Sequence, residues 1–226
     1  MVRRSNTTPL CVLLACTLCA GCSVNPPAIL EVFWQVNYRA IPPLAEPVEE
    51  LSLFLHLQDE DGDDDIEAIS LLNDTAELYW GLHGGNWERT EISEESWFGS
   101  SELRMYRDGR FPRGAYRLIV TDLAGERGEA SLFISADRSP PVASDLPSLV
   151  IDAEKITIAG SDERTGLWFY DGGGEVVKVV MTSSKLVDLG SILNATERSR
   201  STSVSAYTFD NEKGIGLISQ PYHLDP

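Results

Sequence analysis

The chain has 226 residues, of which 42% are hydrophobic and 23% are charged, a composition typical of a globular protein. Its formal net charge of −17 repels phosphate backbones and anionic lipid headgroups, which excludes nucleic acid as an expected partner. All four cysteines lie within the first 22 residues, so the remainder of the chain has no cysteine nucleophile.

The first 22 residues have the layout of an export signal. Arg3 and Arg4 form a positively charged start, and an apolar stretch of 12 residues follows over 9–20. This stretch is shorter than the ~20 apolar residues that a membrane-spanning helix needs. The small residues that precede Cys22 predict cleavage immediately before it, so that residues 1–21 are a signal peptide. An ordinary secretory cleavage nearby is the alternative.

The sequence Ala20-Gly21-Cys22 resembles the lipobox of bacterial lipoproteins. Cys19 stands where that family prefers leucine, which is similar to the looser boxes of some bacterial groups, spirochaetes among them. The resemblance implies a diacylglyceryl thioether on Cys22 and an acylated amino group, with palmitate as the typical chain. Because each buried methylene contributes ~0.8 kcal/mol, two or three acyl chains anchor a protein stably. An alternative box that ends at Cys16 would leave an implausibly short apolar region.

Residues 22–29, with two consecutive prolines, are predicted to form an extended linker between the anchor and the folded part. Ser23 occupies the position at which enterobacterial lipoproteins carry aspartate when they stay at the inner membrane. The resemblance therefore implies a location outside the cytoplasm, at the outer membrane or the cell surface. Loss of Arg3 and Arg4 with the signal leaves 16 basic and 35 acidic residues, a net charge of −19.

Alternating apolar residues predict β-strands along most of the remaining chain. The first two runs are Leu30, Val32, Trp34, Val36 and Tyr38, and then Leu51, Leu53, Leu55 and Leu57. Shorter strands are predicted over 115–121, 130–135, 155–159, 166–170, 175–181 and 203–209, bounded by Gly, Asp, Asn or Pro. The only helical segments predicted are two single turns, one over 191–196 and one over 93–98. Many short strands separated by turns favour an all-β sandwich.

An acidic loop follows the second run and places six carboxylates within residues 59–65. Such crowding favours a counter-ion, and Ca²⁺ takes 6 to 8 oxygen ligands. Aligned with an EF-hand loop, Asp59, Asp61 and Asp63 fall at ligand positions, and Asp65 completes the candidate set.

Two positions depart from the EF-hand pattern. Asp64 stands where that loop needs glycine, and Ser70 stands where it has a bidentate glutamate. The alternative interpretation is a turn in which Gly62 supplies a positive φ and the aspartates bond to the local backbone.

Three of the five tryptophans, Trp80, Trp87 and Trp97, fall within 20 residues rich in glycine and acids. Rigid aromatic side chains give large contact areas, so Trp87 and Trp97 are candidate residues for binding a carbohydrate or a protein. The alternative is that these tryptophans belong to the hydrophobic core, with Trp80 between the sheets.

A proline-rich boundary over 137–147 divides the strands into two groups, 30–136 and 148–226. Each group ends in a similar hairpin, at 114–135 and at 204–220. Both hairpins resemble the last one of immunoglobulin-like and fibronectin type III-like modules, which implies two tandem β-sandwiches. The resemblance also implies that Tyr116 bonds to the backbone at a corner of the first module. A single large sandwich is the alternative.

The sequence contains no pattern that predicts catalysis. The three histidines are widely spaced, and no Gly-x-Ser-x-Gly elbow or phosphate loop is present. The glycines at 172–174 are predicted to form a hairpin turn. We therefore expect a membrane-anchored lipoprotein of the cell envelope with a non-catalytic binding or structural role and no required cofactor. The alternatives are a calcium-stabilised adhesin, a carbohydrate-binding module and a periplasmic enzyme or accessory subunit.

Overall fold

The computed structural model describes residues 25–93, 95–106, 109–135, 140–160 and 164–224, and it is predominantly β. The strands are β1 (Ala28–Arg39), β2 (Val48–Gln58), β3 (Ile66–Asn73), β4 (Leu78–His83), β5 (Glu88–Ile92), β6 (Glu95–Arg104), β7 (Gly114–Asp122), β8 (Arg127–Ile134), β9 (Ser148–Asp152), β10 (Lys155–Ala159), β11 (Thr165–Tyr170), β12 (Val176–Thr182), β13 (Leu186–Asp188), β14 (Ser203–Asp210), β15 (Ile215–Ile218) and β16 (Tyr222–His223). Two short helices, α1 (Leu189–Ile192) and α2 (Ala195–Arg200), and two single 3₁₀ turns, Asp63–Asp65 and Ala143–Asp145, complete the elements.

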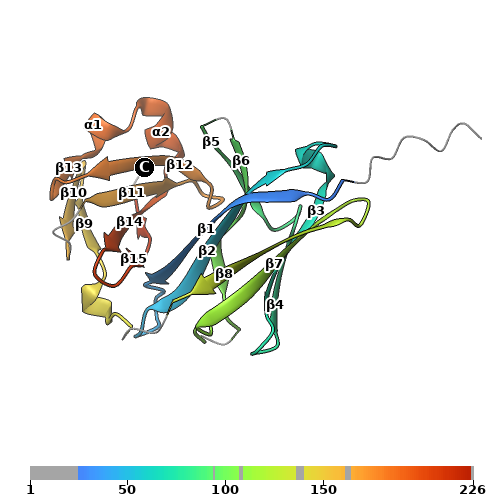
Figure 1. The fold of residues 1–226 in the computed structure, drawn as a ribbon. Coiled ribbons are helices and arrows are strands. Elements are labelled where there is room, and N and C mark those ends of the chain that lie inside the picture. Colours follow the sequence, from blue (N-terminus) through green and yellow to red (C-terminus); the bar gives the residue numbers. More distant parts are fainter. Residues whose placement is uncertain (1–24, 94, 107–108, 136–139, 161–163, 225–226) are drawn as a thin grey trace, which may run out of the picture.

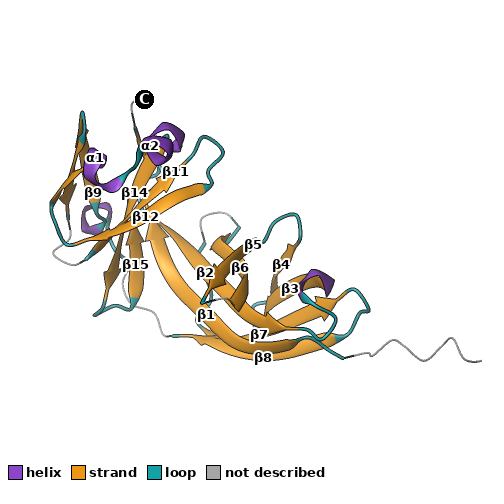
Figure 2. Cartoon of the chain, turned by 90° about the horizontal axis from the view of Figure 1, so that it is seen from above, coloured by secondary structure: helices purple, strands orange, loops and turns teal. Residues whose placement is uncertain are grey.

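The described strands form three sheets. The largest has the order β12-β11-β14-β15-β1-β2-β6-β5, with β16 paired to β14. A four-stranded sheet has the order β4-β3-β7-β8, and a three-stranded sheet has the order β13-β10-β9. In Figures 1 and 2, β1–β8 gather on one side of the molecule, and β9–β15 with the two helices gather on the other.

The first hydrophobic core lies between β1, β2 and β6 of the large sheet and the four-stranded sheet. The alternating leucines of β2 are its centre, because Leu51, Leu53 and Leu55 are fully buried. They pack with residues of the opposite sheet such as Ile69 and Leu118. Each fully buried leucine stabilises the fold by ~1.5–3 kcal/mol, so this pattern fixes which face of β2 points inward.

A second core lies between β11 and β14 of the large sheet and the three-stranded sheet. Its fully buried members include Ile156, Leu167 and Phe169. Helix α1 contributes Leu189 to this core, and α2 follows within two residues. Asn194 caps α2, because its side chain accepts a hydrogen bond from the Glu197 N–H.

The large sheet continues from one core to the other through a parallel pairing of β1 with β15. Asn37 pairs with Gly216 and Arg39 with Ile218, and Leu217 between them is buried in the first core. A Cβ on Gly216 would lie 2.0 Å from the Asn37 side-chain oxygen and 2.8 Å from the Tyr207 ring. Glycine at 216 therefore permits the close approach of the two strands. We call this junction the seam.

Two sequence predictions about local structure are wrong. Residues 93–98 were expected to form a helical turn, but β6 begins at Glu95 and pairs with β2 through Trp97 and Phe98. Leu30 was expected to face the core with Val32, but it is 49% exposed. A bulge between Ile29 and Glu31 shifts the register at this end of β1, so Ile29 packs against the core instead.

The prediction for Tyr116 is confirmed. Its ring is buried in the first core, and its hydroxyl donates a hydrogen bond of 2.7 Å to the Pro112 carbonyl. This bond ties the segment before β7 to the strand itself. The predicted turn at 172–174 is also present and connects β11 to β12, with Gly174 at a φ of 87°.

Candidate functional site

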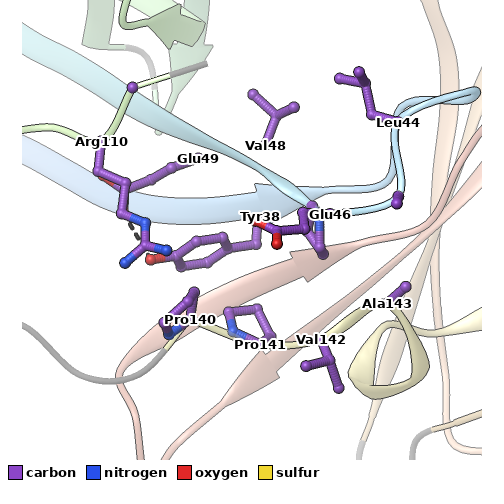
Figure 3. Close-up of a pocket in the computed structure, with 13 residues that line it drawn as sticks. Tyr38, Leu44, Glu46, Val48, Glu49, Arg110, Pro140, Pro141, Val142 and Ala143 are labelled. Atoms are coloured by element: carbon purple, nitrogen blue, oxygen red, sulfur yellow. Dashed lines mark hydrogen bonds between the residues drawn. The ribbon is translucent and has the colours of Figure 1, made fainter.

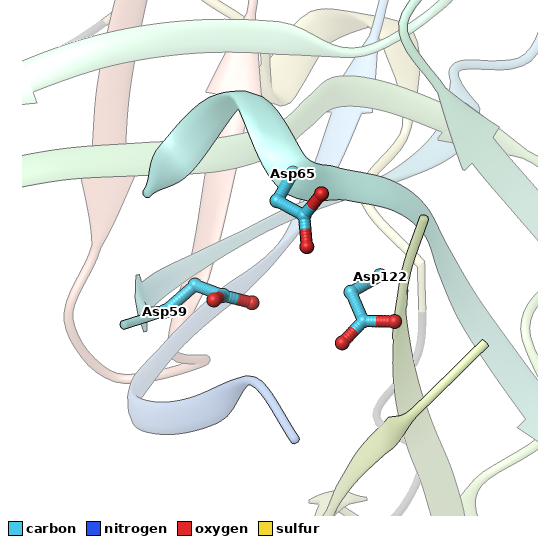
Figure 4. Close-up of side chains that lie close together, drawn as sticks. All are labelled: Asp59, Asp65 and Asp122. Atoms are coloured by element: carbon cyan, nitrogen blue, oxygen red, sulfur yellow. The ribbon is translucent and has the colours of Figure 1, made fainter. Parts of the chain in front are cut away.

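Three carboxylates meet at one end of the first core (Figure 4). Asp59 follows β2, Asp65 ends the 3₁₀ turn and Asp122 ends β7. One oxygen from each lies within 4.8 Å of the others. The Leu123 N–H donates to the Asp65 carbonyl over 2.8 Å and holds the two loops together. The strands thus bring together groups that lie far apart in the sequence.

The surroundings of this cluster are partly polar. Asp122 is only 2% exposed, and its Oδ1 accepts a hydrogen bond from the Glu126 N–H over 2.8 Å. Asp59 Oδ1 accepts one from the Asp61 N–H over 2.9 Å. Asp59 Oδ2 is buried and has no hydrogen-bond partner among the described residues. A cation is the natural partner for such an oxygen, and hard oxygen ligands are those that Ca²⁺ prefers.

The carboxylates also repel one another. The pKa of Asp65 is raised above its ordinary value, first by loss of hydration and then by the charges of Asp122, Asp59 and Asp61. A carboxyl whose folded pKa is raised destabilises the fold while it is ionised, and this penalty disappears as the pH falls through the raised pKa.

Only part of the predicted metal site is assembled. The structure brings Asp59 and Asp65 together, but Asp61 is exposed and Asp63 binds Arg89, with 2.7 Å between the carboxylate and the guanidinium. Asp122 is absent from the predicted set because it lies 57 residues beyond Asp65. The sequence signal for it was the turn that begins at Asp122, directly after a strand. Calcium binding here stays a prediction.

We expect Asp65→Asn to raise the melting temperature in EDTA at pH 7, because it removes one of the repelling charges. The gain should shrink as the pH falls through the raised pKa of Asp65 and be largely lost by pH ~4, because the native carboxyl is then protonated and no longer repelled. Added Ca²⁺ should raise the melting temperature of the native chain and have less effect on the variant. Differential scanning fluorimetry measures both. Glu67→Gln, on an exposed residue nearby, is the control. An equal response of both variants to calcium would contradict a site at Asp65.

The two candidate binding tryptophans differ in burial. Trp97 is 9% exposed and stacks on His56, with ring centroids 5.5 Å apart. Trp87 packs against the first core and meets Phe98 edge-on at 5.5 Å. Trp80 also packs against this core and stacks on Phe111. Trp97 is therefore buried and Trp87 is half-buried, and a binding role for either stays a prediction.

A hollow of about 510 Å³ lies beside the turn between β1 and β2, where residues 140–143 pass over it (Figure 3). Tyr38 and Glu49 lie at its wall, and the Tyr38 hydroxyl donates to Glu49 over 2.6 Å. Burial and this glutamate raise the pKa of Tyr38. Glu49 also accepts hydrogen bonds from the Phe111 N–H and from Arg113. Because its oxygens are fully used, Glu49 stabilises the fold and offers little to a ligand.

A second hollow, of about 460 Å³, lies across the seam. We call it the seam cleft. Strands β1, β2, β11 and β14 contribute Asn37, Arg39, Ser52, Trp168, Tyr170 and Tyr207 to its lining. These residues alternate with the core residues of the same strands, so they lie on the opposite face of the large sheet. This site leaves no local signal in the sequence, because its lining residues are dispersed from Asn37 to Ile218.

The predicted lipidation site, Cys22, lies outside the described residues. Within the described part of the chain, no helix has both the length and the apolar character required to span a bilayer.

No protein-family model matches the chain, and no curated protein sequence is similar to it. Among solved structures, the chain is similar to Tp47, the 47-kilodalton lipoprotein of Treponema pallidum, with 12% identity, 86% of this chain and 50% of that chain covered, and a TM-score of 0.41. It is also similar to dimeric latent PorU from Porphyromonas gingivalis. The identity is 14%, the match covers 88% of this chain and 20% of PorU, and the TM-score is 0.35. A third similar structure is murine CEACAM1b. The identity is 16%, the match covers 84% of this chain and 99% of CEACAM1b, and the TM-score is 0.21. The chain thus spans half the length of Tp47, and likenesses of this strength assign no function.

Proposed function

We propose that the protein is a lipid-anchored lipoprotein of the cell envelope that binds a partner, without catalysis, through two tandem immunoglobulin-like modules. The strand order supports the modules. The pair of sheets β1-β2-β6-β5 and β4-β3-β7-β8 follows the arrangement ABED and C′CFG of immunoglobulin-like sandwiches. The pair β9-β10-β13 and β12-β11-β14-β15 follows the arrangement ABE and C′CFG. Each pair encloses its own core, and the boundary falls between Ile134 and Ser148.

The observation that carries the binding role is the continuous sheet at the seam. In a tandem of modules joined only by a linker, relative motion is the default. Here backbone pairing of β1 with β15 and the burial of Leu217 in the first core fix one module against the other. Two modules held in this way present one preformed surface, which lowers the entropic cost of binding.

The charges of the seam cleft support a non-catalytic role. Arg39 bonds Glu50 over 2.9 Å and Glu102 over 3.2 Å, and Arg104 bonds Glu50 as well. The charges of both carboxylates are therefore compensated by guanidinium groups within the protein. The proposed location is the outer membrane or the cell surface, where a large negative charge keeps an exposed protein soluble.

We expect Cys22→Ala to release the protein from membranes, because the thioether has no other attachment point in the chain expected after cleavage. The native chain should incorporate labelled palmitate and sediment with membranes, and the variant should do neither. Cys19→Ala is the matched control and should remain labelled. Labelling of the Cys22→Ala protein, or equal loss in both variants, would contradict anchoring at Cys22.

Protease treatment of intact and permeabilised cells separates the two faces of the envelope. Digestion in intact cells supports a binding role at the cell surface. Protection until permeabilisation contradicts surface exposure and favours a periplasmic structural role.

A further inference from the structure

We propose that the seam cleft binds a short segment of a neutral carbohydrate. This inference rests on the proposed binding role and names the class of ligand for it. The cleft has a volume of about 460 Å³, within the ~300–1,000 Å³ typical of small-molecule sites. Its lining combines three aromatic rings with a larger number of polar and charged groups, so it suits a ligand that is itself rich in hydrogen-bonding groups.

The aromatic part of the cleft comes from the second group of strands. Trp168 on β11 and Tyr207 on β14 have ring centroids 6.4 Å apart and an interplanar angle of 54°. Tyr170 lies two residues after Trp168 and therefore on the same face of β11. All three side chains are partly exposed, so their rings are accessible from the cleft. Tilted rings of this kind contact the C–H faces of sugars through dispersion and their negative π faces.

The polar part of the cleft contains groups without partners. Asn37 is 4% exposed and Ser205 is 2% exposed, yet Asn37 Oδ1 and Ser205 Oγ have no hydrogen-bond partner among the described residues. Both residues line the cleft. Tyr207, which is partly exposed, also lines the cleft. Buried polar groups are normally satisfied, so Asn37 Oδ1 and Ser205 Oγ mark a surface that a ligand with both donors and acceptors completes.

The charges of the cleft favour a neutral ligand. Arg39 is held by Glu50 and Glu102, and Glu88 accepts hydrogen bonds from the Ser101 N–H and hydroxyl, each over 2.7 Å. Arg39, Glu102 and Glu88 are thus bonded within the protein, and the remaining charged residue of the lining, the exposed Glu175, adds a negative charge that disfavours an anionic ligand. Hydroxyl, amide and aromatic groups make up most of the rest of the lining. The net charge of −17 disfavours anionic glycans and phosphate. The uncharged polar groups of the lining are best matched by ligand hydroxyl groups, because a hydroxyl both donates and accepts hydrogen bonds. Carbohydrates carry such hydroxyl groups at high density.

The test uses the chain from Ser23 to Pro226, which contains every described residue, on an array of immobilised neutral and acidic glycans. We expect binding to at least one neutral glycan, followed by titration of that glycan as a free oligosaccharide. Trp168→Ala should weaken binding at least tenfold, and Tyr207→Phe, which removes only the hydroxyl, should weaken it severalfold. Phe33→Ala is the matched control, because Phe33 is a 50% exposed aromatic residue on β1 outside the cleft lining.

Circular dichroism and the melting temperature identify a variant that fails to fold. If Trp168→Ala fails to fold, the affinity of the conservative variant Tyr207→Phe decides whether the cleft binds the glycan. The inference is overturned if no neutral glycan binds, if only acidic glycans or a control oligolysine peptide bind, or if the two cleft variants bind as tightly as Phe33→Ala. Because the soluble chain carries no lipid, these outcomes are independent of the Cys22 experiment. Failure of the anchor and failure of the cleft are therefore distinguishable.

Discussion

Replacing Glu49 by alanine is expected to lower the free energy of unfolding by about 3–5 kcal/mol, the usual loss when one partner of a buried ion pair is removed. Glu49 is 3% exposed and accepts hydrogen bonds from Tyr38, from the Phe111 N–H and from both terminal nitrogens of Arg113. Alanine leaves all of these donors without their acceptor, and it leaves the Arg113 charge partly buried. Water reaches this position poorly, so solvation does not replace the lost bonds.

Urea denaturation of the chain from Ser23 measures this loss. Tyr38→Phe removes one of the hydrogen bonds and should cost only about 1 kcal/mol. Glu46→Ala, three residues earlier on an exposed position, should change stability by no more than ~0.5 kcal/mol. If Glu49→Ala were no more destabilising than Glu46→Ala, the hydrogen-bond network at Glu49 would not be an important source of stability.

Replacing Gly99 by alanine is expected to lower the free energy of unfolding by at least ~3 kcal/mol. This loss is at or above the largest usually caused by overpacking a core site. Gly99 lies on β6 opposite Phe54, and a Cβ there would lie 1.9 Å from the Leu53 carbonyl oxygen and 2.7 Å from the Phe54 Cα. Both neighbours are backbone atoms of the central strand β2. They cannot rotate away, so β6 must move and lose its pairing with β2.

Gly84→Ala is the matched control, because a Cβ at Gly84 meets nothing within 4 Å and its φ is not positive. This variant should be neutral or slightly stabilising, since alanine restricts the unfolded chain. The two variants differ from the native chain by the same methyl group. Equal unfolding midpoints for them would show that β6 does not approach β2 as closely as described.

Local patterns in the sequence identified most of the strands because each strand buries one face. Leu51, Leu53, Leu55 and Leu57 are all buried, as their alternation predicted. The pattern failed at Leu30, because a bulge changes which side of the strand a residue faces without altering composition. It failed again at 93–98, where pairing with β2 determines the conformation rather than local preference.

The candidate sites were harder to predict because they depend on pairing between distant segments. Asp122 joins Asp59 and Asp65 only because β3 and β7 are neighbours in one sheet. The seam cleft requires Asn37 and Ser205 to lie on a shared surface, which follows from the pairing of β1 with β15. Loop composition drew attention to Trp87 and Trp97, whereas the tryptophan of the cleft, Trp168, lies within a strand whose neighbours gave no such signal.

The position of β1 determines how the protein would carry tension. In the proposed arrangement the lipid holds the chain a few residues before Ala28, where β1 begins, and a ligand in the cleft pulls on the far end of the same strand. Such a load acts along β1, which is paired with β2 from Ala28 to Arg39. The hydrogen bonds of an antiparallel pair are perpendicular to the strands, so they are sheared together rather than opened one after another. This geometry predicts mechanical resistance at the membrane-proximal end, and the same strand would transmit force from the cleft to the anchor.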